Sequence, residues 1–245
     1  MRQFGLIGYP LSHSFSKKYF TEKFEKEGLY DCAYENYPIA SIAALQEMLA
    51  GNPALEGFNI TIPYKEQVLP FLSDESDVVK EIKACNCIKI AGDKLIGYNT
   101  DVTGFEFSLK ARLGNHHKKA LILGTGGAAK AVEYVLRKLG IHYRYVSRTP
   151  LPGNLSYGDV TAELLADYTL IINTTPLGMY PNAAELPAIP YTSLGRNHYL
   201  FDLVYNPEKT LFLQRGEEQG AVIKNGQDML VIQAEESWKI WNNIK

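Results

Sequence analysis

The sequence predicts an α/β fold built on a parallel sheet, and three observations carry this prediction. Short apolar runs that suit buried strands alternate with segments in which apolar residues recur with helical periodicity. A glycine-rich turn joins one such run, Ala120–Leu123, directly to a helical segment. The chain of 245 residues is long enough for one large domain or two small ones.

The turn that begins at Gly124 is the clearest local signal. Gly124, Gly126 and Ala129 follow the G-x-G-x-x-G/A spacing of dinucleotide-binding proteins. In such a turn the first glycine allows the tight bend and the second lets a pyrophosphate approach the backbone, while the free N–H groups of the helix face the anion. A glycine-rich strand–helix connection that binds nothing is the alternative interpretation of the same residues.

The next strand, His142–Val146, ends at a residue that bears on the choice of cofactor. Arg148 stands 24 residues after Gly124, where an NAD site usually has an acidic residue for the ribose 2′-hydroxyl. A guanidinium at this place suits a 2′-phosphate instead. The sequence therefore predicts NADP.

Composition and charge argue against several classes of partner. The net charge is −2 with charges interspersed, so we expect no nucleic-acid or membrane partner. Met1 leads directly into a strand-like run, Arg2–Gly8, and no secretory leader is expected. The three cysteines, Cys32, Cys85 and Cys87, form neither a disulfide framework nor a complete zinc site. We expect a cytoplasmic protein without a metal.

The N-terminal segment predicts a strand followed by a helix. Phe4–Ile7 reads as the strand, and a helical stretch runs through Phe20 to Gly28. Ser14 and Ser16 lie where the chain turns into this helix. One of them is expected as an N-cap, and the alternative is that both hydroxyls bind a small carboxylate.

Five further elements are predicted between residues 32 and 98. Cys32–Tyr37 predicts a strand, Ile39–Leu49 a helix and residues 73–83 a second helix. Asn86–Ile90 and Lys94–Tyr98 predict a hairpin.

The strand Phe58–Ile62 carries polar residues on one face. Asn59 and Thr61 alternate with its apolar residues. Pro63 suits the first turn of a helix, which would place Lys65 at the exit of the strand beside that polar face. A solvated lysine is the alternative.

Individual residues predict one helix start and one loop. Asp101 is placed to act as the N-cap of a helix that carries Phe105 and Leu109. After Arg148, prolines and a glycine exclude a regular helix, so the crossover there should be a loop.

The C-terminal half completes the parallel pattern. Three more strands are predicted at Thr169–Ile172, His198–Leu203 and Ala221–Ile223. The last helix, Gln227–Ile244, has an apolar stripe that Gln233 borders, an unusual place for a merely solvated residue.

Taken in order, these motifs resemble the shikimate dehydrogenase family. The resemblance runs from about residue 4 to residue 241 and is carried by HSFS, NITIPYK, ACN, GYNTD, GTGGAAKA, SRT, NTTPLGM, DLVYNPEKT and GQDMLVIQAEESWKIW. It implies NADPH-dependent, reversible reduction of 3-dehydroshikimate to shikimate, a step of aromatic amino-acid (chorismate) biosynthesis. It also implies two domains: a substrate-binding catalytic domain of residues 1–101 plus 227–245, and a Rossmann-type NADP-binding domain of residues 102–226.

The resemblance assigns roles to matching positions. It makes Lys65 and Asp101 the catalytic pair. The substrate-binding positions are Ser14, Ser16, Asn59, Thr61, Lys65, Asn86, Asp101, Tyr205 and Gln233. The cofactor-binding positions are Asp77, Gly124, Thr125, Gly126, Gly127, Ala128, Ser147, Arg148, Thr149, Leu203 and Gly226. The implied partners are small molecules, and the implied assembly is a monomer or a homodimer.

Some positions depart from the family pattern. Lys17 replaces a proline after the second serine, Ser147 replaces an asparagine, and ACNC replaces A-V-N-T around Asn86. The loop after Arg148 and Thr149 lacks the second basic residue common in the family, so NADP preference depends largely on Arg148.

Two alternatives stay open at this point. One is a quinate/shikimate dehydrogenase that uses both NAD and NADP, which the missing basic residue favours and Arg148 opposes. The other is a regulator that binds a ring acid without converting it, for which loss of Lys65 or Asp101 is expected; both are present.

A lysine is charged at neutral pH and can donate a proton to a carbonyl oxygen as hydride arrives.

Overall fold

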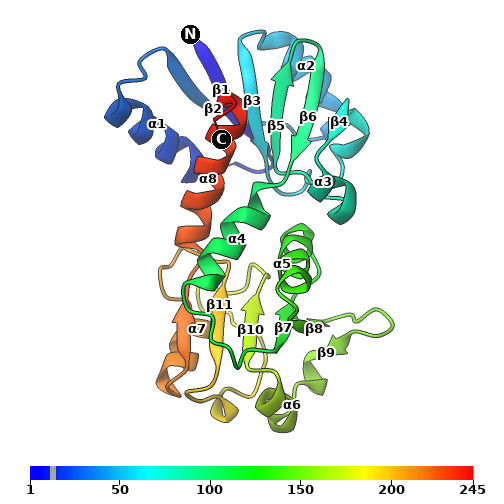
Figure 1. Cartoon of the computed structure of the whole chain (residues 1–245), viewed down its shortest axis with the longest axis vertical. Coiled ribbons are helices and arrows are strands. Elements are labelled where there is room, and N and C mark those ends of the chain that lie inside the picture. The colour runs from blue at the N-terminus through cyan, green and yellow to red at the C-terminus, as the bar shows by residue number, and fades with distance from the viewer. Residues whose placement is uncertain (12–14, 245) are drawn as a thin grey trace. The chain divides into compact units, whose positions relative to one another are not determined.

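The structure, a computed structural model, describes residues 1–11 and 15–244. The chain divides into two compact units. Unit 1 consists of Met1–Thr100 with Gln233–Lys245, and unit 2 of Asp101–Ile232. Within the described residues each unit contains a six-stranded sheet (Figure 1). The predicted α/β class is therefore confirmed.

Unit 1 is built on a mixed sheet with the strand order β2-β1-β3-β5-β6-β4. Its strands are β1 (Arg2–Gly8), β2 (Cys32–Pro38), β3 (Leu55–Ile60), β4 (Asp74–Glu75), β5 (Cys87–Ala91) and β6 (Lys94–Tyr98). Its helices are α1 (Phe15–Glu27), α2 (Leu45–Gly51), α3 (Asp77–Ile82) and most of α8 (Gln227–Asn242). The strands β1, β2 and β3 are parallel, whereas β5 and β6 form the predicted antiparallel hairpin.

The C-terminal helix α8 completes the core of unit 1. The ring of Phe4 on β1 stacks on Trp241 with 5.0 Å between ring centroids and meets Trp238 edge-on at 5.2 Å. Gly57 on β3 allows this close approach, because a Cβ there would lie 2.3 Å from Cδ1 of Trp241. Apolar contact between α8 and the sheet thus explains why the last helix returns to the first unit.

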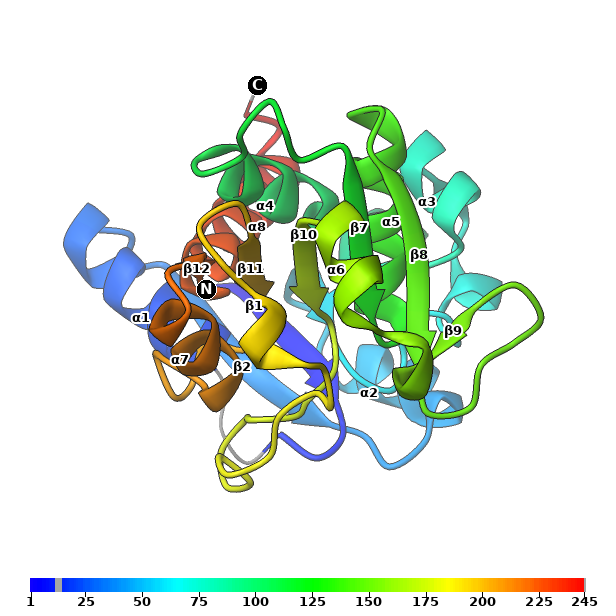
Figure 2. The same cartoon turned by 90° about the horizontal axis from the view of Figure 1, so that it is seen from below.

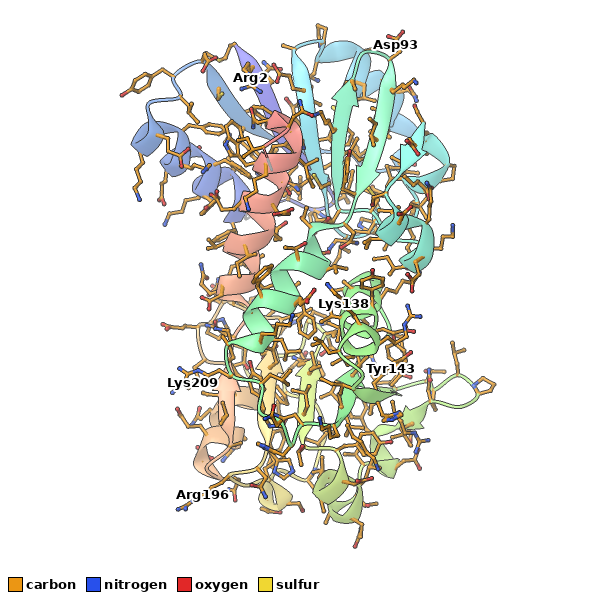
Figure 3. All side chains as sticks on the ribbon, in the orientation of Figure 1. Arg2, Asp93, Lys138, Tyr143, Arg196 and Lys209 are labelled. Carbon is orange, nitrogen blue, oxygen red and sulfur yellow. The ribbon has the colours of Figure 1, made fainter. Side chains whose placement is uncertain are left out.

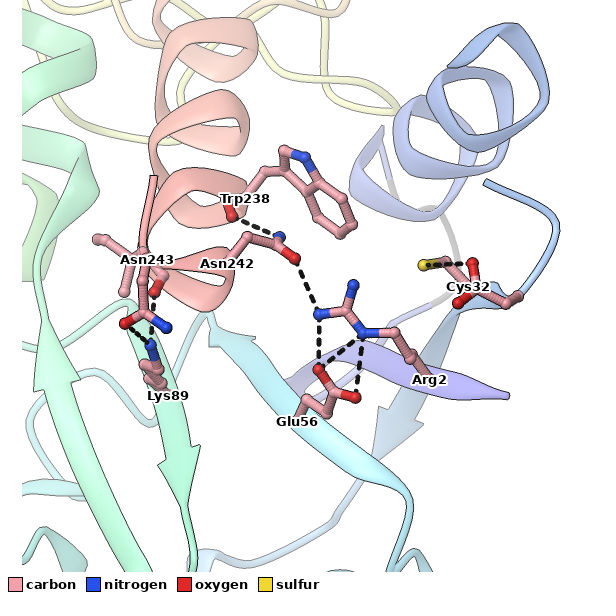
Figure 4. A network of polar contacts seen from close by, with 9 residues as sticks. Arg2, Cys32, Glu56, Lys89, Trp238, Asn242 and Asn243 are labelled. Carbon is pink, nitrogen blue, oxygen red and sulfur yellow. Dashed lines mark hydrogen bonds and ion pairs between the residues drawn. The ribbon is translucent and has the colours of Figure 1, made fainter. Parts of the chain in front are cut away.

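Polar contacts fix the end of α8 to the same strands (Figure 4). Arg2 donates to both carboxylate oxygens of Glu56 and to Oδ1 of Asn242, the latter at 2.8 Å. Lys89 on β5 donates to the backbone oxygen of Ile240 at 3.1 Å. The bond from Lys89 satisfies a backbone carbonyl in the last turn of the helix, where such carbonyls lack partners within the helix. The bond from Arg2 holds the side chain of Asn242.

Unit 2 is built on a fully parallel sheet with the strand order β12-β11-β10-β7-β8-β9. Its strands are β7 (Lys119–Leu123), β8 (His142–Ser147), β9 (Leu155–Ser156), β10 (Leu170–Asn173), β11 (Tyr199–Asp202) and β12 (Val222–Lys224). Its helices are α4 (Thr100–Lys110), α5 (Gly127–Lys138), α6 (Ala162–Asp167) and α7 (Leu211–Glu218). Numbered within the unit, the order is 3-2-1-4-5-6 read from the opposite edge, that of a Rossmann sheet.

The strand β7 lies between β10 and β8 (Figure 2), and its connection to β8 is the predicted glycine turn and helix. The helix α5 buries Ala129, Val132 and Val135 against the sheet, as its periodicity predicts. Tyr143 of β8, labelled in Figure 3, donates to Glu133 of α5 at 2.6 Å. The crossover from β8 to β9 contains no helix among residues 148–154, so the loop prediction is confirmed.

Two local predictions are wrong for the same physical reason. No helix begins at Pro63: residues 62–68 form turns, and the backbone oxygen of Lys65 accepts from the N–H of Cys85 at 2.8 Å. Asp101 is not an N-cap, because α4 already begins at Thr100, whose N–H donates to Oδ1 of Asn86 at 2.7 Å. In both cases a partner distant in sequence satisfies the backbone.

Candidate active site

The predicted substrate-side residues of unit 1 come from three separate parts of the chain. Asn59 lies on β3, Asn86 precedes β5, and Gln233 lies on α8. All three side chains are buried, between 3% and 7% exposed. A buried amide must have hydrogen-bond partners, because an unpaired one costs about 1–3 kcal/mol. Their partners are therefore informative.

Asn59 is held on all sides by the protein itself. Its Oδ1 accepts from the phenol of Tyr34 at 2.9 Å. Its Nδ2 donates to Oγ of Ser237 at 2.9 Å and to the backbone oxygen of Asn86 at 3.2 Å. Both hydrogens of this amide are thus used within unit 1, so any contact of Asn59 with a ligand has to use Oδ1.

Asn86 is oriented by Thr100. The N–H of Thr100 can only donate, so the atom of Asn86 that faces it is Oδ1, and Nδ2 points to Oγ1 of Thr100 at 3.1 Å. Thr100 also lies 3.4 Å from Oε1 of Gln233 and 3.2 Å from Oγ of Ser237. One hydroxyl group therefore links the two predicted amide ligands.

Tyr34, Thr100 and Ser237 are the residues that the sequence did not single out. Ser237 lies on the apolar stripe of α8 and is fully buried, and a serine on such a stripe is a signal of a polar partner inside the core. Tyr34 and Thr100 carry no comparable signal, since tyrosine is common in strands and threonine at helix starts. We name the six residues Tyr34, Asn59, Asn86, Thr100, Gln233 and Ser237 the amide network.

Of the two predicted serines, the structure describes Ser16. Ser14 lies outside the described residues. Ser16 is the second residue of α1 and half-buried, so it is not the N-cap of that helix. Burial raises the pKa of Tyr34 well above its ordinary value, and a hydrogen bond with Ser16 opposes this rise. Ser16 thus lies at the edge of the amide network.

Backbone hydrogen bonds position the loop that carries Thr61 and Lys65. The N–H of Thr61 donates to the oxygen of Ile7 on β1 at 2.9 Å. The bond from Cys85 to Lys65 holds that residue beside the segment leading to Asn86. Asp101 follows Thr100 in the first turn of α4 and belongs to unit 2. The N-terminal turn of a helix favours a carboxylate there.

In unit 2 the glycine turn has the shape that an anion site needs. Gly124 has φ +106°, and a Cβ there would lie 2.8 Å from Oγ1 of Thr174. Gly126 is different, since a Cβ there would meet nothing within 4 Å. Gly126 therefore leaves the backbone accessible from outside, as a pyrophosphate requires.

The helix that starts at this turn lacks a side-chain cap. In the described part of the chain no side chain accepts from the first N–H groups of α5, whose N-cap is Gly126. By contrast, Thr161 and Thr210 cap α6 and α7. The uncapped N–H groups of α5 fit a phosphate, because the helix start attracts negative charge.

The end of β8 supplies the predicted ribose-side residues. Oγ of Ser147 is buried and has no hydrogen-bond partner among the described residues. Arg148 and Thr149 are exposed. Burial raises the pKa of Tyr157, and the charge of Arg148 opposes this rise, so the guanidinium lies within electrostatic range of that ring. An unpaired hydroxyl beside an exposed arginine fits a phosphorylated ribose.

The remaining predicted cofactor positions separate into two groups. Leu203 and Gly226 are neighbours, since a Cβ on Gly226 would lie 2.2 Å from the backbone oxygen of Leu203. Tyr205 follows nearby in sequence, and burial raises its pKa. Asp77 belongs to unit 1, at the start of α3, with a fully exposed side chain. The structure therefore joins Leu203 to Gly226 and places Asp77 in the other unit.

A cavity of about 440 Å³ lies elsewhere in unit 2, beside β12 and α7. Its two lysines, Lys209 and Lys224, already form ion pairs with Glu217 and Asp228. Of the predicted site residues that the structure describes, none lines it.

Among the described helices, none combines the length and the hydropathy needed to cross a bilayer.

Comparison with known proteins extends over the whole chain. Residues 6–88 match the model of the shikimate dehydrogenase substrate binding domain. A relative from Caldicellulosiruptor saccharolyticus, named shikimate dehydrogenase (NADP(+)), is 37% identical over 261 aligned positions that span 100% of this chain and 93% of the relative.

Solved structures agree with this match. A shikimate dehydrogenase crystallised with NADP+ has a TM-score of 0.88 at 30% identity and covers 100% of this chain and 91% of its own. The enzyme from Thermus thermophilus, in complex with NADP(H) and shikimate, has a TM-score of 0.88 at 29% identity and covers 99% and 94%. The predicted resemblance is confirmed: this chain belongs to the shikimate dehydrogenase family.

Proposed function

We propose that this protein catalyses the NADPH-dependent, reversible reduction of 3-dehydroshikimate to shikimate, a step toward chorismate and the aromatic amino acids. The observation that carries the proposal is that a member of this family keeps both Lys65 and Asp101 together with an open, uncapped glycine turn. A regulator that only binds a ring acid has no need of either feature. The relatives that are named NADP(+) enzymes support the same choice of cofactor.

The proposal assigns the substrate mainly to residues of unit 1 and the cofactor mainly to residues of unit 2. Ser14 and Ser16 would bind the carboxylate of the substrate. The residues that would face the ring hydroxyls are Asn59, Thr61, Asn86 and Asp101, and Gln233 and Tyr205 would be further substrate contacts. The turn from Gly124 to Ala128 would bind the pyrophosphate, and Ser147, Arg148 and Thr149 the phosphorylated ribose. Asp77 stays a prediction that no contact in the structure supports.

The chemistry assigns one proton to this chain. When bound, NADPH supplies a hydride to the ketone carbon. Lys65 would donate a proton to the carbonyl oxygen, and Asp101 would be its catalytic partner. In the direction of oxidation the same side chain would accept the proton of the substrate hydroxyl group.

The test is an assay of the purified protein with shikimate or quinate, each with NADP⁺ or NAD⁺, followed by absorbance at 340 nm. We expect turnover of shikimate with NADP⁺ and much slower turnover with NAD⁺. Equal rates with both cofactors, or comparable rates with quinate, would support the dual-specificity alternative. No turnover with any pair, despite binding of shikimate, would support the regulator.

Location and assembly remain part of the proposal. A cytoplasmic protein without nucleic-acid or membrane partners agrees with the near-neutral charge and with three cysteines that are all free thiols. Sedimentation of the purified protein decides between a monomer and a homodimer.

A further inference from the structure

A buried carboxylate that the proposed reaction does not use lies at the carboxyl edge of the unit 2 sheet. Asp202 ends β11 and is fully buried. Its Oδ1 accepts from the N–H of Val204 and from Nδ2 of Asn173, both at 3.0 Å. Its Oδ2 accepts from Oγ1 of Thr210 at 2.5 Å. A charge without water persists only when it is well hydrogen-bonded, and these three donors meet that need.

The donors belong to the loops that follow two neighbouring strands. Asn173 ends β10, and its Oδ1 accepts from both the N–H and the hydroxyl of Thr175. The residue between them, Thr174, donates to the backbone oxygen of Leu123 and lies against Gly124. Through Asn173, the carboxylate of Asp202 is thus linked to the start of the glycine turn.

On its other side Asp202 fixes the segment with the predicted cofactor contacts Leu203 and Gly226. The bond to Val204 shapes the backbone directly after Asp202, and the oxygen of Val204 accepts from the N–H of Gly226 at 3.2 Å. Leu203 in turn donates to the oxygen of Asn173 at 3.0 Å. In parallel α/β sheets, ligands bind at this carboxyl edge.

We propose that Asp202 is a positioning residue for cofactor binding: its buried carboxylate sets the conformation of the loops after β10 and β11, on which Leu203, Gly226 and the glycine turn depend. Asp202 itself does not touch the cofactor. The inference rests on the proposed use of a dinucleotide.

The protonation of this carboxylate falls in an accessible pH range. Burial raises the pKa of Asp202 to about 6, against the effect of its three donors. Among the described residues, no cation contributes to this shift. Among the described residues, the charge of Asp202 acts on Tyr191, whose pKa is raised by burial first and by Asp202 second. Below about pH 6 the carboxyl group becomes neutral and accepts less strongly from Val204 and Asn173.

Acid should therefore change binding and stability in opposite directions. The pKa of Asp202 is higher in the folded than in the unfolded state. The carboxyl group therefore stabilises the fold fully at a pH below its unfolded-state pKa, and this stabilisation is lost as the pH rises through about 6. The neutral form holds the loops less firmly, so dinucleotide binding should weaken over the same interval. A carboxylate that only stabilised the fold would change the free energy of unfolding with pH but would not weaken dinucleotide binding over the same interval.

The experiment measures dissociation constants for NADP⁺ and ADP-ribose by calorimetry from pH 5 to 8, with urea unfolding alongside, for the full chain and its variants. ADP-ribose is included because the 2′-phosphate of NADP⁺ titrates near pH 6. Asp202→Asn should weaken both ligands about tenfold at pH 7.5, because the loops that contact the cofactor lose the charged acceptor that orients them. It should also remove the acid-dependent part of the wild-type ADP-ribose profile and the acid stabilisation.

Two controls keep the test decisive. Asp167→Asn removes an exposed carboxylate of the same unit and should leave every profile unchanged. If Asp202→Asn does not fold, Thr210→Val removes one donor and should move the midpoint of the ADP-ribose profile to higher pH, whereas Thr210→Ser should not. Identical profiles for wild type, Asp202→Asn and Thr210→Val would overturn the inference. Failure of the wild type to bind NADP⁺ would instead overturn the proposed function.

Discussion

The two groups of predicted ligands differ in how far the protein already satisfies them. In unit 1, Asn59 uses both of its N–H donors on Asn86 and Ser237, and Asn86 is oriented by Thr100. In unit 2, the helix start at Gly126 carries no side-chain cap among the described residues, and the hydroxyl of Ser147 is buried without a partner there. Internal bonds therefore use both N–H donors of Asn59, whereas the helix start and the hydroxyl of Ser147 lack a side-chain partner among the described residues.

This difference teaches where each kind of specificity arises. An amide whose N–H donors are already used presents only its oxygen to a ligand, in a fixed orientation. Such an arrangement suits a ring whose hydroxyl positions must be distinguished. Unsatisfied backbone N–H groups accept any phosphate of suitable shape. Substitutions in the amide network should therefore change stability together with activity, whereas a substitution at Gly126 should change binding alone.

The largest expected effect belongs to a residue outside both groups of bonds. Lys65→Ala should lower kcat at least about a hundredfold, because general acid catalysis contributes about 10²–10⁴-fold, or about 3–5 kcal/mol. The KM for shikimate should change far less, the pattern of an interaction made in the transition state. A nearly normal kcat with a much larger KM would make Lys65 a binding residue.

The next effect tests whether the amide network is saturated. Asn59→Ala should lower the free energy of unfolding by about 2–4 kcal/mol, because Tyr34 and Ser237 each lose a partner inside the core. Urea denaturation measures this loss. Asn52→Ala, at a helix end of the same unit, is the control and should cost less. If Asn59→Ala folds as well as wild type but no longer binds shikimate, Asn59 is a ligand and not a scaffold.

The third effect concerns the choice of cofactor. Arg148→Ala should cost about 1.5–3 kcal/mol of NADP⁺ binding, or about 10- to 150-fold in affinity, the contribution of a hydrogen bond to a charged group. NAD⁺ binding should stay nearly constant. Arg144→Ala is a matched control on β8, where the arginine lies within electrostatic range of Asp159. Equal losses for both cofactors would remove Arg148 from the 2′-phosphate site.

The smallest effect sharpens the comparison at the glycine turn. Gly126→Ala should weaken NADP⁺ about tenfold, or about 1.4 kcal/mol, because the added methyl group stands where a pyrophosphate approaches the backbone. The melting temperature should hardly move, since the methyl group meets nothing within 4 Å. Gly195→Ala, also in open space, should change neither property. A large loss of stability in Gly126→Ala would show that the glycine serves the fold.

Local patterns predicted the parts of this protein that local forces determine. The apolar run of β7, the bend at Gly124 and the periodicity of α5 each follow from neighbouring residues, and the lack of a crossover helix follows from prolines after Arg148. The β5–β6 hairpin belongs to the same class. The pattern of neighbouring residues is enough to predict each of these elements, although β7 itself pairs with β8 and β10.

The contacts that local patterns do not predict depend on residues far apart in sequence. The bond between Asn59 and Ser237 joins positions 178 residues apart, and no local pattern contains it. Asn86 satisfies the first N–H of α4, which made Asp101 a wrong choice for the N-cap. Family resemblance supplied Asn86 and Gln233 as ligands, but it did not supply Tyr34 or Thr100, which orient the amides of this network.

The return of α8 to the first sheet has a consequence for synthesis on the ribosome. The aromatic face that Phe4, Phe20 and Phe24 form is covered by Trp238 and Trp241, which are translated after every strand of both sheets. Until these last residues emerge, that face stays exposed and the nascent first unit is vulnerable to aggregation. The parallel sheet of the second unit does not wait for them, so it can reach its native state first, although its chain is made later.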